Sequence, residues 1–178
     1  MQPQCRAVVK TQELIRAIPD FPLPGILFRD ITPLLKDPAG FKEAIDLFVG
    51  RFKGRGIDYV VGVEARGYML GAPLAYAIGA GFVPVRKPGK LPYSKLSESY
   101  ALEYGTNSLE IHEDALGHGE RVVVVDDLLA TGGTAAATRR LLERLGAHIE
   151  AFAFLIELDA LKGREALPGV EVVSFIHY

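Results

Sequence analysis

The spacing of hydrophobic residues changes several times along this chain, and the changes predict helices that alternate with strands. Near residues 9–18 the apolar side chains recur at helical spacing, which predicts a short amphipathic helix. The segment 19–25 that follows contains too many prolines for regular structure. A second helix is expected to begin with Asp37 as its N-cap and Pro38 as its first residue, and to end before Gly54.

The middle of the chain contains continuous apolar runs, which are typical of strands covered on both faces of a parallel sheet. Residues 57–63 form the first run, and a loop over 64–67 leads into an apolar helix near 68–79. Residues 81–86 predict another strand, although Pro84 argues against a central position in the sheet.

The last third of the chain repeats this alternation with clearer boundaries. A strand over 121–126, a loop over 127–133 and a helix over 134–145 follow one another, and two more strands are expected over 148–158 and 170–177. Strands that alternate with helices predict an α/β fold with a doubly wound, mainly parallel central sheet and helices on both faces. Ligands of such sheets bind beyond the carboxyl ends of the strands.

The length of 178 residues fits a single domain over 1–178. One segment, residues 87–108, is polar, rich in proline, glycine, serine and tyrosine, and long for a connection inside a compact domain. Connections of this kind are often lids, so we expect a mobile lid loop there.

Charge and composition remove several classes of partner. The chain has 20 lysine and arginine residues against 22 aspartate and glutamate residues, a net charge of −2, whereas nucleic acids and anionic membranes select for a large basic excess. No apolar run approaches the ~20 residues that span a bilayer. The single Cys5 can form neither an internal disulfide nor a cysteine-based zinc site. We therefore expect a cytoplasmic protein without nucleic-acid or membrane partners.

The loop over 126–134 carries the clearest chemistry. Gly132 and Gly133 let the backbone approach a ligand, and the helix that follows begins with unpaired N–H groups and partial positive charge. Thr131 and Thr134 add hydroxyl donors, so the loop predicts a cradle for a phosphate monoester. It has neither the lysine of a Walker loop nor the G-x-G-x-x-G of a dinucleotide site. The alternative is a plain glycine turn with a threonine cap.

Two carboxylates, Asp126 and Asp127, precede this cradle directly. They would repel a phosphate unless they face something else, and vicinal sugar hydroxyls or a magnesium ion are suitable partners. The pattern therefore predicts a sugar phosphate. The alternative is that one aspartate caps the helix and the other is exposed.

At this point the chain resembles a known family. The segment Val122–Thr134 closely resembles the phosphoribosyl pyrophosphate motif of type I phosphoribosyltransferases, and the resemblance narrows to the adenine phosphoribosyltransferases. It extends over nearly the whole chain through further matches at Phe21–Pro33, Gly62–Gly67, Arg86–Pro92 and Leu102–Gly105. The resemblance implies the type I phosphoribosyltransferase fold with a small N-terminal hood, residues 1–35, that binds the base.

The implied reaction transfers the phosphoribosyl group of phosphoribosyl pyrophosphate to adenine and gives AMP and pyrophosphate, a step of purine salvage. By similarity, the ribose hydroxyls are held by Asp126 and Asp127. The ribose phosphate is cradled by Ala130, Thr131, Gly132, Gly133 and Thr134.

The resemblance also implies a pyrophosphate subsite and two partners. Backbone N–H groups of a strained, often cis, peptide are expected at Arg66 and Gly67. A basic cluster meets the pyrophosphate partly across a homodimer interface, with Tyr104 as a cover, and consists of Arg86, Lys87 and Lys90. Magnesium is expected to arrive with the substrate pyrophosphate and to need no dedicated protein ligand.

The base site falls on the hood. Phe28 resembles the aromatic residue that stacks on adenine, with Leu129 opposite, and backbone groups of Leu27 and Arg29 would read the adenine edge. Arg29 has two alternatives, pairing with Glu103 or bracing the hood. Glu103 matches the residue that moves the proton of the attacking nitrogen, which makes it the candidate catalytic acid–base.

One position bears on base specificity. Hypoxanthine-guanine members of the family carry an aspartate where this chain has Ala130, which argues against oxopurine substrates. Two alternatives stay open: the same chemistry on another base, and a non-catalytic regulator that senses phosphoribosyl pyrophosphate. Such regulators usually add a DNA-binding domain or a basic face, and this composition suggests neither.

Overall fold

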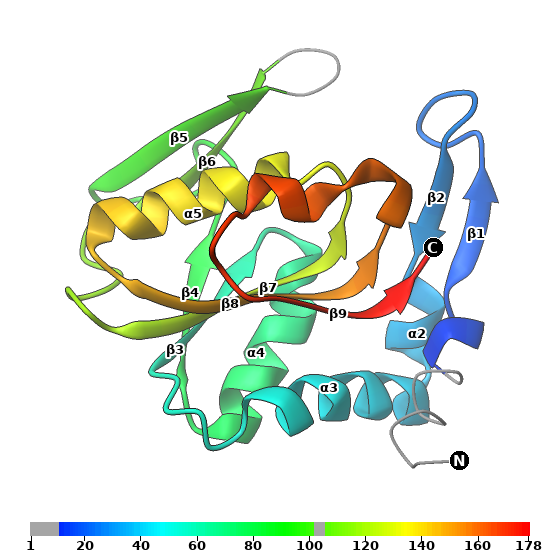
Figure 1. Cartoon of the computed structure of the whole chain (residues 1–178), viewed down its shortest axis with the longest axis horizontal. Coiled ribbons are helices and arrows are strands. Elements are labelled where there is room, and N and C mark those ends of the chain that lie inside the picture. The colour runs from blue at the N-terminus through cyan, green and yellow to red at the C-terminus, as the bar shows by residue number, and fades with distance from the viewer. Residues whose placement is uncertain (1–10, 102–105) are drawn as a thin grey trace. The chain divides into compact units, whose positions relative to one another are not determined.

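The computed structural model describes residues 11–101 and 106–178 (Figure 1). The chain divides into two compact units, one that ends at Arg51 and one over Phe52–Tyr178. The expectation of a single domain stays a prediction.

The first unit begins with a strand pair, which corrects the expected helix over 9–18. Helical backbone is described only at 11–13, and Arg16–Pro19 forms β1, antiparallel to β2 (Leu27–Asp30). Arg16 bonds to the Asp30 carboxylate at 2.6 Å across this pair. The pairing partners lie about a dozen residues away in sequence, and this non-local contact overrides the helical spacing of the apolar residues.

Two helices complete this unit: α2 (Thr32–Lys36) and α3 (Pro38–Phe52). The predicted start of α3 is confirmed, because the Asp37 carboxylate accepts a hydrogen bond of 2.7 Å from the Gly40 N–H. The helix ends before Gly54, whose φ of +80° suits a glycine, as the sequence predicts.

The second unit is built on a parallel sheet, as predicted. Its strand order is β4-β3-β7-β8-β9, and every neighbouring pair is parallel. The strands are β3 (Tyr59–Val63), β4 (Gly81–Val85), β7 (Arg121–Leu129), β8 (His148–Glu157) and β9 (Val172–His177). β4 lies at an edge of the sheet, as Pro84 suggests, so the missing N–H of Pro84 costs no hydrogen bond to a strand on a second side.

Helices cover both faces of this sheet. α4 (Arg66–Ile78) packs on β3 and β7, and α5 (Gly133–Leu145) packs on the other face (Figure 1). Alternate strand residues show the division: Val60 lies against Gly71 of α4, whereas Val61 joins the buried cluster that contains Leu141 and Leu142 of α5. Both loops singled out in the sequence therefore open at the carboxyl ends of the strands.

The segment expected as an irregular lid contains a hairpin. β5 (Lys95–Ala101) and β6 (Thr106–His112) pair antiparallel, and Glu98 ion-pairs with Arg140 of α5 at 2.5 Å. The mobility of 87–108 stays a prediction.

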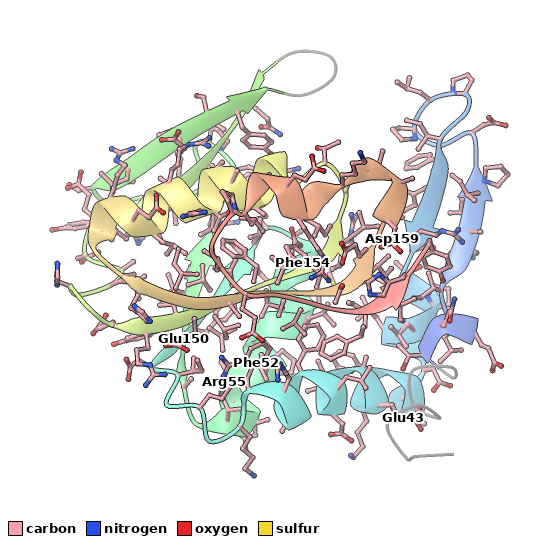
Figure 2. The ribbon with its side chains drawn as sticks, in the orientation of Figure 1. Glu43, Phe52, Arg55, Glu150, Phe154 and Asp159 are labelled. Atoms are coloured by element: carbon pink, nitrogen blue, oxygen red, sulfur yellow. The ribbon has the colours of Figure 1, made fainter. Side chains whose placement is uncertain are left out.

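The amino ends of β8 and β9 are held by an arginine network (Figure 2). Arg55 lies over the Phe52 ring, donates to Glu171 at 2.9 Å and ion-pairs with Glu150 at 3.7 Å. Arg121 reaches the same Glu150 carboxylate at 2.9 Å. Two short turns of 3-10 helix, η1 (Asp159–Leu161) and η2 (Gly163–Ala166), connect β8 to β9 at the other end of the sheet.

Candidate active site

A cavity of about 400 Å³ opens at the carboxyl ends of β3 and β7. This volume lies in the range of small-molecule sites. Every described residue that lines it belongs to the second unit. Loop 64–66, the acidic pair and the whole stretch Leu128–Ala135 contribute to the lining, together with Lys87, Tyr100 and Asn107. The structure thus brings together most of the residues assigned to phosphoribosyl pyrophosphate.

The cradle loop has the geometry that its glycines suggest. Gly132 precedes α5 with a φ of +83°, and a Cβ there would lie 2.5 Å from the Gly163 carbonyl oxygen. Only glycine meets both demands. No side chain of the described residues caps the start of α5, so its first N–H groups are available to an anion.

Thr134 and the hairpin meet at the cavity wall. The Thr134 hydroxyl donates to the Tyr100 hydroxyl at 3.2 Å, and Tyr100 pairs with Asn107 across β5 and β6. Tyr100 and Asn107 line the cavity although no sequence motif assigned them to it. The available signal was position: Tyr100 stands two residues before the family-like motif Leu102–Gly105.

The acidic pair has two different environments. Asp127 is 3% exposed and ion-pairs with the Arg66 guanidinium. No cation of the described residues forms an ion pair with Asp126, and burial, followed by the neighbouring Asp127 carboxylate, raises the pKa of Asp126 well above its usual range. Gly67 lets the start of α4 approach the end of β7 closely, since a Cβ there would lie 2.6 Å from the Val125 carbonyl oxygen.

A cis peptide is present near the expected pyrophosphate loop, but it lies between Glu64 and Ala65 rather than at Arg66 and Gly67. Burial opposes ionisation of Glu64, but the Lys87 N–H and the Arg86 guanidinium, each 3.1 Å away, outweigh it and lower its pKa. Arg86 also donates to the Lys90 carbonyl oxygen at 3.0 Å. Within the basic cluster, therefore, Lys87 lines the cavity while Arg86 is engaged by Glu64.

The residues assigned to the base are divided between the two units. Leu27, Phe28 and Arg29 lie on β2 in the first unit, where the Phe28 ring meets the Phe21 ring edge-on at 5.1 Å. Leu129 ends β7 in the second unit and borders the cavity. Glu103, Tyr104 and Cys5 lie outside the described residues.

Comparison with known proteins identifies the class. A family model described as the phosphoribosyl transferase domain matches residues 30–173. The chain is 61% identical over 169 residues to an adenine phosphoribosyltransferase of Methylococcus capsulatus, covering 95% of this chain and 99% of that one. It is 57% identical to the Roseiflexus sp. enzyme of the same name, covering 93% and 96% of the two chains.

Solved structures of adenine phosphoribosyltransferases have the same fold as this chain. An adenine phosphoribosyltransferase of Thermoanaerobacter pseudethanolicus superposes with a TM-score of 0.93 at 53% identity, covering 96% of this chain and 99% of the other. The Saccharomyces cerevisiae enzyme, solved with an imino-altritol bisphosphate and adenine, gives 0.92 at 40% identity with the same coverage. The chain belongs to the phosphoribosyltransferase family and, within it, to the adenine phosphoribosyltransferases. No helix of the described residues is long and apolar enough to cross a membrane.

Proposed function

We propose that this chain transfers the phosphoribosyl group of phosphoribosyl pyrophosphate to adenine and releases AMP and pyrophosphate, in purine salvage. The observation that carries the proposal is the acidic pair near the end of β7, followed by a loop and a glycine-started helix that no side chain of the described residues caps, all at the cavity of an adenine phosphoribosyltransferase fold. Substrate positioning and electrostatics supply most of the rate in such a displacement.

The ribose phosphate lies in the cradle. The backbone N–H groups from Ala130 to Thr134 and the Thr131 hydroxyl donate to its oxygens, and the Thr134 hydroxyl exchanges its bond to Tyr100 for one to the phosphate. Asp126 and Asp127 accept from the ribose hydroxyls, and their negative charge stabilises the positive charge that develops on the ribose in an oxocarbenium-like transition state.

The pyrophosphate leaves toward the other loop. Arg66 and the N–H of Gly67 meet it at the start of α4, and Lys87 reaches it from the cavity wall. Arg86 and Lys90 complete the cluster, Arg86 by holding Glu64 and Lys87 in place. Tyr104 covers the group.

Magnesium fits this donor set as a companion of the substrate. Among the described residues, the cavity is lined by the carboxylates of Glu64, Asp126 and Asp127, and arginines engage two of them. Asp126 and Asp127 are the residues that would hold the ion indirectly, through the ribose hydroxyls. When bound, the ion neutralises charge on the leaving pyrophosphate.

The base is held from the hood. Phe28 stacks on adenine opposite Leu129, and the backbone of Leu27 and Arg29 reads its edge. Glu103 moves the proton of the attacking nitrogen. Glu103→Gln should lower turnover roughly 10²–10⁴-fold while leaving phosphoribosyl pyrophosphate binding nearly unchanged. Unchanged turnover would remove Glu103 from the mechanism.

A homodimer is part of the proposal, and α4 supports it. Met69 and Tyr76 project from the helix at 46% and 91% exposure, with Ala72 exposed between them. Such an apolar stripe is typical of a protein interface. We keep a cytoplasmic location as a prediction.

A panel of bases tests the function. The protein is mixed with magnesium, phosphoribosyl pyrophosphate and adenine, hypoxanthine, guanine, uracil or orotate, and pyrophosphate release is followed. We expect turnover with adenine. Turnover with hypoxanthine but not adenine contradicts the argument from Ala130, and binding without turnover on any base indicates a regulator.

A further inference from the structure

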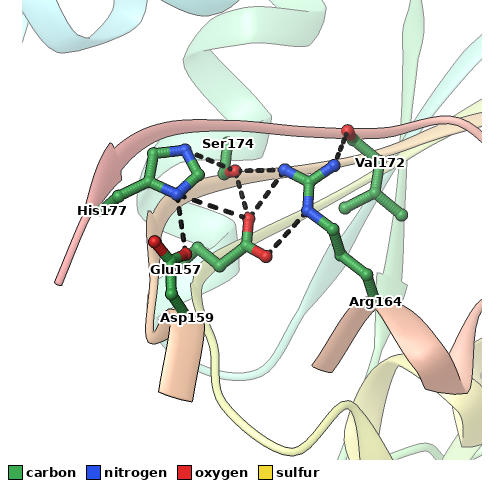
Figure 3. A network of polar contacts seen from close by, with 6 residues as sticks. All are labelled: Glu157, Asp159, Arg164, Val172, Ser174 and His177. Atoms are coloured by element: carbon green, nitrogen blue, oxygen red, sulfur yellow. Dashed lines mark hydrogen bonds and ion pairs between the residues drawn. The ribbon is translucent and has the colours of Figure 1, made fainter. Parts of the chain in front are cut away.

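A polar network outside the cavity lining connects the ends of β8 and β9 with η2 (Figure 3). Its centre is Glu157, the last residue of β8, which is 4% exposed. Arg164 of η2 holds both carboxylate oxygens in a fork: Nε donates to Oε1 at 2.7 Å and Nη2 donates to Oε2 at 2.7 Å. A paired fork of this kind fixes orientation as well as charge.

The network is braced from β9. Arg164 also donates to the Val172 carbonyl oxygen at 2.8 Å and to the Ser174 hydroxyl at 2.6 Å. Ser174 donates in turn to Glu157. Burial opposes ionisation of Glu157, but Arg164 and Ser174 outweigh it and lower its pKa. Arg164 is thus fixed by two strands at once.

The same cluster could be mistaken for a metal site. Glu157, Asp159 and His177 offer ligand atoms within 4.8 Å of one another, and His177 Nδ1 lies 2.8 Å from Asp159. Both oxygens of Glu157 are already engaged by Arg164, however. A cation there would have to displace a buried ion pair, so the arrangement favours a structural anchor.

The opposite side of η2 touches the cradle loop. A Cβ at Gly163 would lie 2.3 Å from the Ala130 carbonyl oxygen, and one at Gly132 would lie 2.7 Å from the Ala166 Cβ. The Leu129 carbonyl oxygen accepts from the Leu158 N–H at 3.0 Å. Backbone therefore lies directly on backbone, and any shift of η2 is transmitted to the residues that cradle the phosphate.

We propose that Glu157 and Arg164 are positioning residues for the ribose phosphate: their fork holds η2 against Ala130 and Gly132, and η2 holds the cradle. This inference rests on the proposed function, which assigns the phosphate to that loop. Neither side chain lines the cavity among the described residues, so the effect reaches the substrate only through the loop backbone.

Arg164→Lys is the main test, because it keeps the charge and loses the fork. We expect kcat/KM for phosphoribosyl pyrophosphate to fall about 10- to 100-fold, while KM for adenine changes little, since sub-ångström to ångström misplacement of a binding group has effects of this size. Ribose 5-phosphate binding, measured by calorimetry without turnover, should weaken in parallel.

Arg55→Lys is the matched control. Arg55 also joins carboxylates of the β8 and β9 region, but at the amino ends of these strands, far from the cradle in sequence and topology. It should lower the melting temperature without changing ribose 5-phosphate affinity. Equal affinity losses in both variants, in proportion to lost stability, would overturn the inference.

Gly163→Ala keeps the test decisive if Arg164→Lys folds poorly. The added methyl group would press on the Ala130 carbonyl oxygen and leave the ion pair intact. It should weaken ribose 5-phosphate binding, and unchanged binding would contradict the inference. Thr134→Val separates the two proposals: a loss of affinity in this variant but not in Arg164→Lys or Gly163→Ala overturns the inference alone, whereas unchanged affinity in all three contradicts the proposed cradle too.

Discussion

The amino ends of the strands and the carboxyl end of β7 differ in how their charged side chains are paired. At the amino ends, Arg55 and Arg121 converge on Glu150, so each charge has a partner. At the carboxyl end of β7, Asp126 sits beside Asp127, and no side chain of the described residues caps the start of α5. The amino ends are arranged for stability, whereas the end of β7 keeps helix N–H donors and a repelling carboxylate that a ligand would satisfy.

Two glycines that flank β7 differ in the same way. Gly119, just before β7, has a φ of +81°, and a Cβ added there would meet no atom of the described residues within 4 Å. Gly132, just after β7, has a φ of +83°, and a Cβ there would lie 2.5 Å from backbone. Gly119 is needed only for its left-handed backbone conformation. Gly132 is needed for that conformation and also for a close backbone contact.

Gly132→Ala is therefore expected to have the largest effect. The methyl group would displace η2 or the cradle, and kcat/KM for phosphoribosyl pyrophosphate should fall at least about 100-fold. Gly119→Ala carries the same backbone strain in open space, so it should cost about 1 kcal/mol of stability and leave steady-state kinetics unchanged. Similar kinetic losses in both variants would show that the two glycines have the same role.

Asp126→Asn should separate stability from activity. Removing a carboxylate that repels its neighbour should raise the unfolding free energy at pH 7 by on the order of 1 kcal/mol, while turnover falls about 10- to 100-fold because the ribose loses an acceptor. Chemical denaturation and steady-state kinetics measure the two effects. A variant that loses both stability and activity would show that Asp126 supports the fold.

Much of this architecture was predictable because the signals are local. The Asp37 cap, the edge strand with Pro84 and the glycine that ends α5 at Gly146 each depend on a few consecutive residues. The cradle and the acidic pair are local as well, since one strand–loop–helix segment carries both.

The elements that the sequence did not predict depend on contacts between residues far apart in the chain. Ile18 pairs with Phe28, and this contact converts the end of an expected helix into β1. In β5 the side chains of Leu96, Glu98 and Tyr100 share one face. Glu98 places a charge where an alternating strand pattern would have an apolar residue, and this charge is tolerated because Arg140 bonds to it. One sequence signal points to the Glu157–Arg164 fork: the apolar run 151–156 ends on a carboxylate, and a buried carboxylate requires a partner.

Arg55→Gln tests the amino end. The substitution leaves Glu150 and Glu171 with less compensation, so the unfolding free energy should fall by about 1–2 kcal/mol. We expect kcat/KM for both substrates to stay within about twofold. A selective loss of phosphoribosyl pyrophosphate affinity would show that the two ends are coupled and that Arg55 also acts on the substrate site.

The smallest expected effect is on the pH dependence of stability. Burial and Asp127 raise the pKa of Asp126, so the folded state binds a proton that the unfolded state releases, and stability should rise as the pH falls from 7 toward the usual value of 3.8. Glu64 and Glu157 have lowered pKa values, so the stability they contribute is present above the usual 4.5 and is lost below it. Thermal melts should therefore show a shallow maximum in the acid range, and Asp126→Asn should remove its rising limb but keep the loss below pH 4.5. A maximum that survives in Asp126→Asn would assign the proton to another group, and the carboxyl end would then lack the unfavourable charge that distinguishes it from the amino end.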